Sequence, residues 1–230
     1  MKLVSTFAAL ALVVSACGGG GSDSVPAVIN PPNCTPTVAV NLYGDSTMLG
    51  IIVRPDGTYY TSTTNAPDIV LRELLDRRFG AGKVVVTNYG VGGEILATFL
   101  SRGKPMEGIS LSNYGINDRG MNDLPAFEAN LRKISPTFYV TPNPLNAHLD
   151  WWVGDEPKTY ESYVQAVRAA GAERNIPVID VYTWLLSQAD WRLQLDAAGI
   201  HPSEALYRRL TTELYYPAIE QQVVKRLCVV

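Results

Sequence analysis

The chain has 230 residues, of which 47% are hydrophobic and 18% are charged. This composition suits one sizeable α/β domain and argues against a disordered or fibrous protein. The formal net charge is −3, and no stripe of clustered lysine and arginine is present, which argues against a nucleic-acid partner.

The N-terminus is predicted to direct export. Lys2 precedes an apolar run over residues 3–14 that is too short to span a bilayer and has the length of a signal-peptide core. The run closes with Ser15-Ala16-Cys17, which resembles the bacterial lipoprotein signal. Residues 1–16 are thus predicted to be a signal peptide, and Cys17 to carry the lipid that anchors the protein in the cell envelope. An ordinary signal peptide with a coincidental cysteine is the alternative.

A tether is predicted over residues 17–36, before a folded domain over residues 37–230. The tether begins with a flexible Gly/Ser-rich run and continues with a stiffer proline-rich stretch. With Cys17 lipidated, Cys34 and Cys228 remain, one at each end of the folded part. In an exported protein they can form a disulfide, and two unpaired thiols are the alternative.

The first predicted strand leads to the candidate nucleophile. An alternating, β-prone run over residues 38–43 stops at Gly44, and Asp45 and Ser46 follow directly. A sharp strand exit of this kind leaves a hydroxyl exposed above a sheet, so Ser46 is predicted to be a nucleophile. An ordinary turn, in which the short polar side chains bond their own backbone, is the alternative.

Strands and helices then alternate along the chain. A hairpin is predicted over residues 51–61, with a turn at Pro55-Asp56-Gly57. Further strands are predicted at residues 83–87, 108–112, 137–140 and 177–181, and the run at 83–87 is expected to be buried on both faces. Helices are predicted at residues 67–79, 95–100, 123–134 and 160–174, and from Ser203 onward with a break at Pro217.

This alternation predicts a five-stranded parallel sheet covered by helices on both faces. In such sheets the ligand lies beyond the carboxyl ends of the strands. Ser46, residues 90–93 and Asn117 follow predicted strands one, two and three, so they should share one rim of the sheet.

A serine hydroxyl needs a base, which is most often histidine. The chain has two histidines. His148 lies in a loop rich in proline and tryptophan, whereas His201 stands just before the last helical stretch, where Pro202 at the helix start would hold the imidazole at the helix entrance. His201 is therefore the candidate base, and a partly exposed histidine near a helix cap is the alternative.

The oxyanion formed by nucleophilic attack needs hydrogen-bond donors. Gly93 offers a backbone N–H with no side chain in the way, Asn117 offers a side-chain amide, and Ser46 can add its own N–H. A tight strand-to-helix turn for the glycines and an Asx-type turn for Asn117 are compatible alternatives.

Four stretches resemble, in order, the sequence blocks of the SGNH, or GDSL-like, hydrolases: Gly44-Asp45-Ser46, Asn88 to Gly93, Gly115-Ile116-Asn117-Asp118 and Gly199-Ile200-His201-Pro202. The resemblance covers nearly all of the chain after the tether. It implies a flavodoxin-like three-layer α/β/α sandwich and hydrolysis of carboxylic esters or thioesters through an acyl-serine. It also implies that Ser46 is the nucleophile and His201 the base, with Gly93 and Asn117 as oxyanion donors.

The last block departs from the family pattern. The family normally carries aspartate three residues before the histidine, and Ala198 stands there in this chain. Asp196, five residues before His201, could orient the imidazole if the loop bulges. Asp180 is more remote, and a Ser-His dyad without an acid is a further alternative.

The substrate is predicted to be a small-molecule or glycan ester, with Asp45, Trp151 and Trp152 as candidate substrate-binding residues. The tryptophans could instead pack their loop onto the protein body. No cofactor is expected, and no metal-ligand spacing accompanies the two distant histidines. The protein is expected to act as a monomeric esterase. An acyltransferase that uses the same residues and a catalytically silent binding module are the alternative functions.

Overall fold

The computed structural model describes residues 34–146 and 157–228. The predicted signal peptide, the lipidation site Cys17 and most of the tether lie outside the described residues. So do His148, Trp151 and Trp152.

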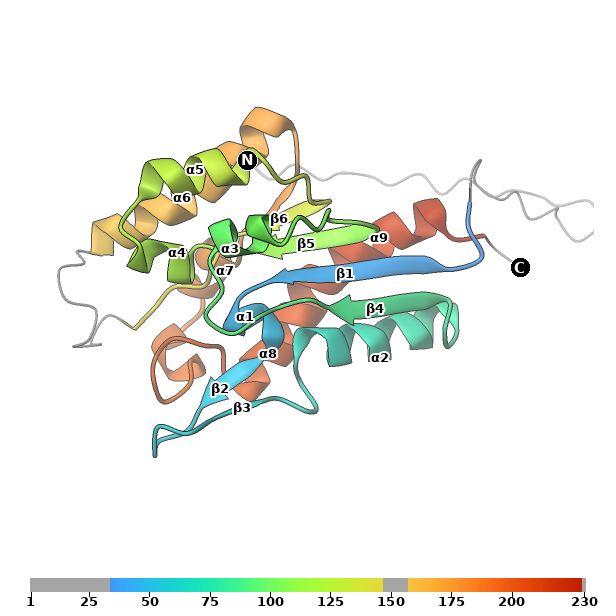
Figure 1. Ribbon diagram of the computed structural model, residues 1–230. Helices are drawn as coiled ribbons and strands as arrows, with labels where there is room; N and C mark the ends of the chain where they lie inside the picture. The colour runs from blue at the N-terminus through green and yellow to red at the C-terminus, as the bar shows by residue number, and fades with distance from the viewer. Residues whose placement is uncertain (1–33, 147–156, 229–230) are drawn as a thin grey trace, which may run out of the picture.

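Within the described residues, five parallel strands form the central sheet (Figure 1). They are β1 (Val38–Gly44), β4 (Val84–Asn88), β5 (Ile109–Asn113), β6 (Phe138–Val140) and β7 (Val178–Ile179). Their spatial order is β4-β1-β5-β6-β7, which becomes the flavodoxin-like order 2-1-3-4-5 when these five strands are numbered along the chain. The predicted fold class is confirmed.

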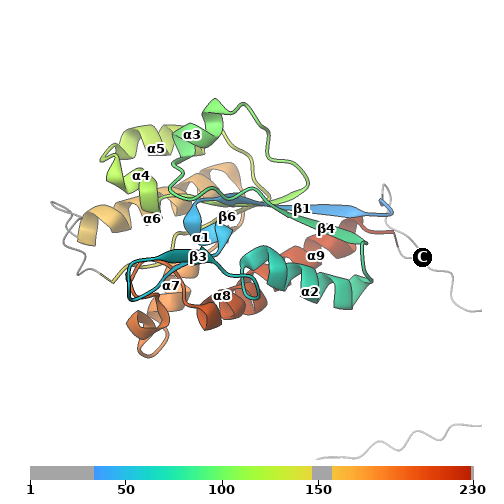
Figure 2. The same ribbon diagram turned by 60° about the horizontal axis from the view of Figure 1, so that its bottom comes forward.

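Helices cover both faces of the sheet, as Figures 1 and 2 show. One face packs against α2 (Pro67–Phe79), α7 (Val181–Leu186), α8 (Glu204–Leu210) and α9 (Tyr216–Arg226), through a mainly aliphatic core. The other face packs against α3 (Leu96–Ser101), α5 (Leu124–Leu131) and α6 (Pro157–Arg174), where the core is rich in tyrosine and phenylalanine. Burial of each large apolar side chain contributes about 1.5 to 3 kcal/mol, so both faces anchor the sheet firmly.

Shorter elements surround the rim formed by the strand ends. They are α1 (Ser46–Leu49), the antiparallel hairpin of β2 (Ile51–Val53) and β3 (Tyr59–Thr61), α4 (Ile116–Gly120) and the 3-10 helix η1 (Trp191–Gln194). The hairpin lies between the first strand and the first long helix, as predicted. In Figure 2 it runs beside the loop that leads into α8.

Three expectations for individual elements are wrong. β4 is an edge strand, so Val85 is 52% exposed and the strand is not buried on both faces. The last strand ends at Ile179, because Asp180 accepts a hydrogen bond from the N–H of Thr183 and begins α7. The C-terminal helix does not break at Pro217. A π-helical segment, η2 (Thr211–Tyr215), joins α8 to α9, and Pro217 lies in the first turn of α9, where a proline is tolerated.

The two ends of the folded part lie together. Cys34 and Cys228 form a disulfide, and the N–H of Cys228 donates to the carbonyl of Thr35 over 2.8 Å. This junction precedes the N-terminal end of β1, whereas Ser46 follows its C-terminal end (Figure 1). A stretch apolar and long enough to cross a bilayer is not found among the described helices.

Candidate active site

Ser46 stands at the turn from β1 into α1. Gly44 ends the strand so close to β5 that an added Cβ would lie 2.5 Å from the carbonyl oxygen of Asn113. Asp45 then caps α1 by accepting a hydrogen bond from the N–H of Thr47 over 2.9 Å. Glycine and aspartate thus make the turn tight, and Ser46 remains partly exposed above the sheet.

His201 faces this hydroxyl. Its Nε2 lies 2.9 Å from the Oγ of Ser46, although 155 residues separate them in the sequence. The imidazole is almost entirely buried. Pro202 precedes the helix rather than starting it, because Ser203 is the N-cap of α8, and Pro202 instead pairs with Leu195 in an antiparallel bridge. The structure therefore holds His201 through this bridge rather than through a proline at the helix start.

Asp196 contacts the other nitrogen of the imidazole. Its Oδ2 lies 2.8 Å from His201 Nδ1. The loop between them closes on itself, because the N–H of Asp196 donates to the carbonyl of His201 over 2.7 Å and Gly199 adopts a φ of 68°. This narrow loop brings together two residues that stand five apart in the sequence, so the aspartate contacts the imidazole despite Ala198.

Hydrogen bonds keep Asp196 ionised. Burial by itself raises the pKa of this carboxyl, but the bonds from His201 and from the N–H groups of Val53 and Ile200 outweigh burial and hold the pKa below its ordinary value. An ionised carboxylate accepts a hydrogen bond from a protonated Nδ1 of His201. Nε2 is then the nitrogen that can accept the proton of Ser46.

Asp180 has a different environment. Its carboxylate pairs with the Arg168 guanidinium at 3.0 Å, accepts a hydrogen bond from Thr141, and caps α7 through Thr183. Of the two candidate acids, only Asp196 contacts His201.

Hydrogen bonds connect the segments that carry the candidate oxyanion donors. The N–H of Val91 donates to the carbonyl of Gly44 over 3.0 Å, which joins the loop that carries Gly93 to the end of β1. The Asn117 amide donates to the Glu94 carbonyl over 3.3 Å. Gly93 has a φ of 74°, a conformation that favours glycine. Ser46 at the start of α1, Gly93 in the loop after β4 and Asn117 in α4 therefore follow the ends of β1, β4 and β5, and hydrogen bonds join the Gly93 loop to the other two segments.

Asp45 does not fit its predicted role. Its side chain is completely buried beneath the turn, so it cannot contact a substrate, and the prediction that it binds substrate is wrong. Burial raises its pKa to about 7. The same turn chemistry that exposes Ser46 directs the preceding side chain inward, since Asp45 is needed as a helix cap.

Two further buried carboxylates hold the rim loops together. Asp118 accepts hydrogen bonds from the N–H groups of Leu96 and Gly115, and burial raises its pKa to about 6. Glu94 accepts from Arg102 and from the hydroxyl of Tyr114. The sequence predicted no role for either acid. Asp118 could have been recognised as the third helical residue of α4, a capping position, whereas nothing local distinguishes Glu94.

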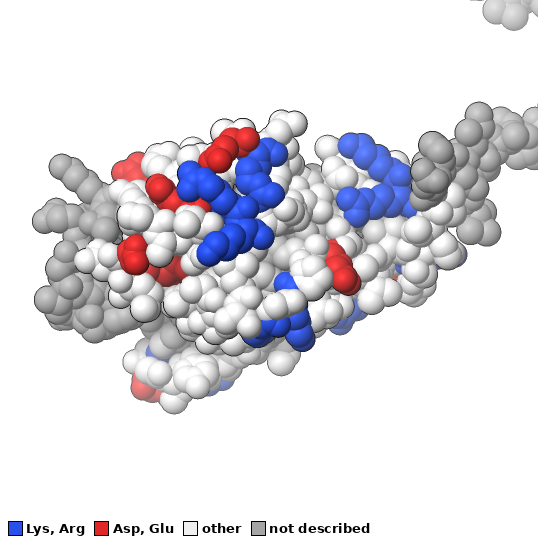
Figure 3. Space-filling view, turned by 45° about the horizontal axis from the view of Figure 1, so that its top comes forward, with Lys and Arg blue, Asp and Glu red and all other residues white. Residues whose placement is uncertain are grey.

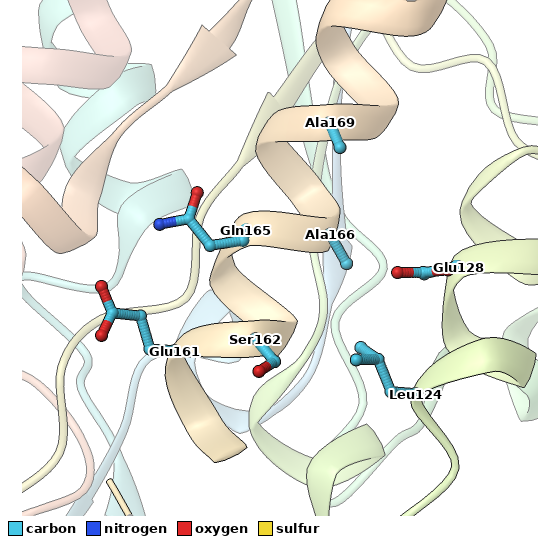
Figure 4. A pocket seen from close by; sticks show the side chains of 7 residues that line it. All are labelled: Leu124, Glu128, Glu161, Ser162, Gln165, Ala166 and Ala169. Atoms are coloured by element: carbon cyan, nitrogen blue, oxygen red, sulfur yellow. The ribbon is translucent and has the colours of Figure 1, made fainter. Parts of the chain in front are cut away.

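Two pockets elsewhere on the surface do not include Ser46 or His201 in their lining. A groove of about 470 Å³ lies along α5 and α6, where Ala166 and Ala169 of α6 face Leu124 and Glu128 of α5, whereas the Glu161 side chain points away from α5 (Figure 4). A second pocket of about 240 Å³ lies beside the Gly93 loop and is lined in part by Tyr43, Tyr89 and Phe99.

The charge around these features is mixed. On the face in Figure 3, lysine and arginine lie in small groups among acidic and uncharged side chains. Among the residues that the structure describes, no group of three or more His, Cys, Asp or Glu side chains could hold a metal ion.

Comparisons with known proteins agree with this arrangement. A model of the GDSL-like lipase/acylhydrolase family matches residues 42–209. No curated protein matches the chain in sequence.

Several solved structures share the fold. A lipase/acylhydrolase from Enterococcus faecalis is 21% identical with a TM-score of 0.58, and the match covers 77% of this chain and 97% of that one. An aryl esterase from M. smegmatis is 16% identical with a TM-score of 0.60, and the match covers 82% of this chain and 100% of that one. The acetylxylan esterase Axe2 from Geobacillus stearothermophilus is 17% identical with a TM-score of 0.57, and the match covers 84% of this chain and 96% of that one.

Proposed function

Because the chain belongs to the GDSL-like lipase/acylhydrolase family, we propose that it is a serine esterase that hydrolyses carboxylic esters through an acyl-serine intermediate. The observation that carries this proposal is the continuous contact from Ser46 through His201 to Asp196, with distances of 2.9 and 2.8 Å. Nucleophile, base and orienting acid are thereby in hydrogen-bond reach of one another.

The first half of the proposed reaction forms the acyl-enzyme. Ser46 Oγ attacks the ester carbonyl carbon while His201 Nε2 takes the hydroxyl proton. The N–H groups of Ser46 and Gly93 and the Asn117 amide stabilise the oxyanion, and each such donor is worth about 3 to 4 kcal/mol of barrier. The imidazolium returns its proton to the departing alkoxide, so the alcohol leaves and the acyl group stays on Ser46.

The second half regenerates the enzyme. His201 takes a proton from water, the resulting hydroxide attacks the acyl carbon, and Ser46 Oγ departs with a proton from the imidazolium. Throughout, Asp196 accepts a hydrogen bond from the Nδ1–H of His201 and stabilises the imidazolium. A sugar hydroxyl in place of water would give acyl transfer by the same residues, and analysis of the products separates the two reactions.

An acylated glycan is the substrate class that we propose. One of the fold neighbours is described as an acetylxylan esterase. In this chain, Tyr89 is exposed on the same loop as Gly93, and its ring stacks on Tyr43 with 5.2 Å between centroids. A tyrosine ring supported in this way offers a flat amphipathic face on which a sugar ring can pack. Trp151 and Trp152 remain further candidates from the sequence.

Export and lipid anchoring through Cys17 also belong to this proposal. Their support is the apolar run over residues 3–14 and the small residues before Cys17. Mass spectrometry of the membrane-bound protein tests them, because a mature N-terminus other than an acylated Cys17 would contradict the anchor.

The decisive experiment measures hydrolysis of p-nitrophenyl acetate by the purified protein and by Ser46→Ala and His201→Ala. We expect each substitution to lower kcat by at least about 10⁴-fold, since each removes a member of one chemical unit. Ser187→Ala, which changes an exposed serine, is the matched control and should retain full activity. A Ser46→Ala variant as active as wild type would refute the proposal. Acetate release from acetylated xylan then tests the glycan class.

A further inference from the structure

Two segments far apart in the sequence meet beside the candidate active site. The first, which we call the hairpin segment, comprises residues 51–65 and includes β2 and β3. The second, which we call the acid-base loop, comprises residues 195–203 and carries Asp196 and His201. The helix α8 follows this loop directly and begins with Glu204.

The main chain of the hairpin segment binds the acid itself. The N–H of Val53 donates to Asp196 Oδ2 over 2.8 Å, and the Val53 carbonyl accepts from the N–H of Ala197 over 3.3 Å. Asp196 Oδ2 is the same oxygen that lies 2.8 Å from His201 Nδ1. The Val53 N–H, which lies outside the acid-base loop, and His201 Nδ1 therefore bind the same carboxylate oxygen.

Glu204 joins the far end of the hairpin segment to the loop. Its Oε2 accepts hydrogen bonds from the Ser62 hydroxyl over 2.6 Å and from the Asn65 amide over 2.8 Å. Its Oε1 accepts from the hydroxyl of Tyr60 over 3.2 Å. A charged carboxylate with three donors is a stronger connection than neutral hydrogen bonds would make. Glu204 stands three residues after His201, so this connection acts close to the base.

A third contact supports the beginning of the hairpin segment. The buried hydroxyl of Tyr207, one turn further along α8, donates to the carbonyl of Ile51 over 2.8 Å. The segment is thus bound to α8 and the acid-base loop near both of its ends and at Val53.

We propose that the hairpin segment positions Asp196 and His201 against Ser46, with Glu204 as the positioning residue that fixes the segment to the acid-base loop. This inference rests on the proposed esterase function. The physical need arises from spacing: four residues separate Asp196 from His201, so the loop has conformational freedom that its own backbone bonds restrain only in part. A misplacement of about 1 Å at a catalytic group costs up to about 100-fold in rate.

Kinetics of Glu204 variants test the proposal. We expect Glu204→Ala to lower kcat for p-nitrophenyl acetate by about 10-fold to 100-fold with KM nearly unchanged, because the Glu204 carboxylate binds side chains of the hairpin segment. Glu204→Gln keeps one acceptor oxygen and should recover part of the loss. Tyr207→Phe should lower kcat by a smaller factor. Glu213→Ala is the matched control, because it removes an exposed ion pair with Arg209 from the same run of helix.

A spectroscopic measurement separates this proposal from the esterase proposal. The chain has two histidines, so the imidazole protons of His201 can be assigned by comparison with His148→Gln. The Nδ1 proton shared with Asp196 should move upfield in Glu204→Ala and stay in place in Glu213→Ala. Unchanged kcat and an unchanged proton signal in Glu204→Ala would overturn the positioning role. An active Ser46→Ala would instead overturn the esterase proposal, and the proton signal would still decide the role of Glu204.

Discussion

The carboxylate of Asp196 accepts hydrogen bonds on both of its oxygens, although it stands two residues away from the place where the family carries its acid. What a catalytic acid needs is a position beside Nδ1 and enough donors to remain ionised. Neither requirement fixes the number of residues between the acid and the histidine. At the scale of a residue, Ala198 is therefore compatible with the triad that we propose, since Asp196 contacts the imidazole.

The first prediction compares the two aspartates. We expect Asp196→Ala to lower kcat on the order of 10³-fold to 10⁴-fold, somewhat less than loss of Ser46 or His201, because the imidazole loses its orienting partner. Asp180→Asn keeps the cap of α7 and should leave kcat close to wild type. Steady-state kinetics on p-nitrophenyl acetate decide between them. A larger loss of kcat in Asp180→Asn than in Asp196→Ala would show that Asp180, and not Asp196, is the acid.

The activity of wild type should also fall as the pH is lowered. Nε2 of His201 must be unprotonated to accept the Ser46 proton. A rate that stays flat from about pH 8 to about pH 5 would contradict the assignment of a histidine base.

Asp45 gives a prediction on stability. Burial raises its pKa to about 7 from an ordinary value of 3.8. Between these values the folded protein keeps a proton that the unfolded chain has released, so rising pH favours unfolding by at most about 1.4 kcal/mol per pH unit. Stability on this account is highest below the ordinary pKa and reaches its lowest level above pH about 7.

The variant Asp45→Asn removes this titration but keeps the oxygen that accepts from Thr47. We expect its Tm to rise relative to wild type as the pH increases from about 5 to about 8. Asp118, whose pKa burial raises to about 6, adds a slope of the same sign to both proteins, so the comparison isolates Asp45. Glu161→Gln, at an exposed position of α6, is the control. Parallel Tm profiles for Asp45→Asn and wild type would contradict the prediction.

At the scale of elements, the hairpin of β2 and β3 is the clearest case in which a local pattern and a distant contact combine. Its turn residues, Pro55-Asp56-Gly57, predict the hairpin from the sequence alone. On the hairpin side, its contacts with the acid-base loop are made by the N–H and the carbonyl of Val53, which are backbone groups that no side-chain pattern reveals. The hairpin could therefore be predicted, whereas its connection to Asp196 could not.

The boundaries of the elements show the same division. The helix α2 begins at Pro67 and ends before Gly80, as predicted, because proline and glycine act locally at helix ends. The exposure of Val85 depends on which strand lies at the edge of the central sheet, and that order follows from the packing of all five of its strands. The π-helical segment before Pro217 likewise depends on how the C-terminal helices pack.

At the scale of the whole molecule, the disulfide between Cys34 and Cys228 closes a loop of 194 residues. We expect the double variant Cys34→Ser/Cys228→Ser to lose about 2 to 4 kcal/mol of unfolding free energy, since the unfolded chain regains the freedom of its two ends. Denaturant unfolding, with and without a reducing agent, measures this loss.

Reduction should destabilise wild type but leave the double variant unchanged, which controls for effects of the reagent itself. Esterase activity should survive in the double variant, because the disulfide lies beyond the N-terminal end of β1 and Ser46 beyond its C-terminal end (Figure 1). Equal stability of wild type and double variant would show that the ends contribute nothing to the folded state.

The sequence by itself determined the order of strands and helices, the α/β class, and the local chemistry that presents Ser46 and places Asn117 and His201 after strand ends or before a helix. These features depend on periodicity, turn residues and helix ends, which act over a few positions. Only the tertiary structure decided that Asp196 rather than Asp180 contacts His201, that Asp45 faces inward, and that the hairpin segment meets the acid-base loop. Each of these features is a contact, or a burial, that depends on residues far apart in the sequence. Such contacts are set by how the sheet and its helices pack together.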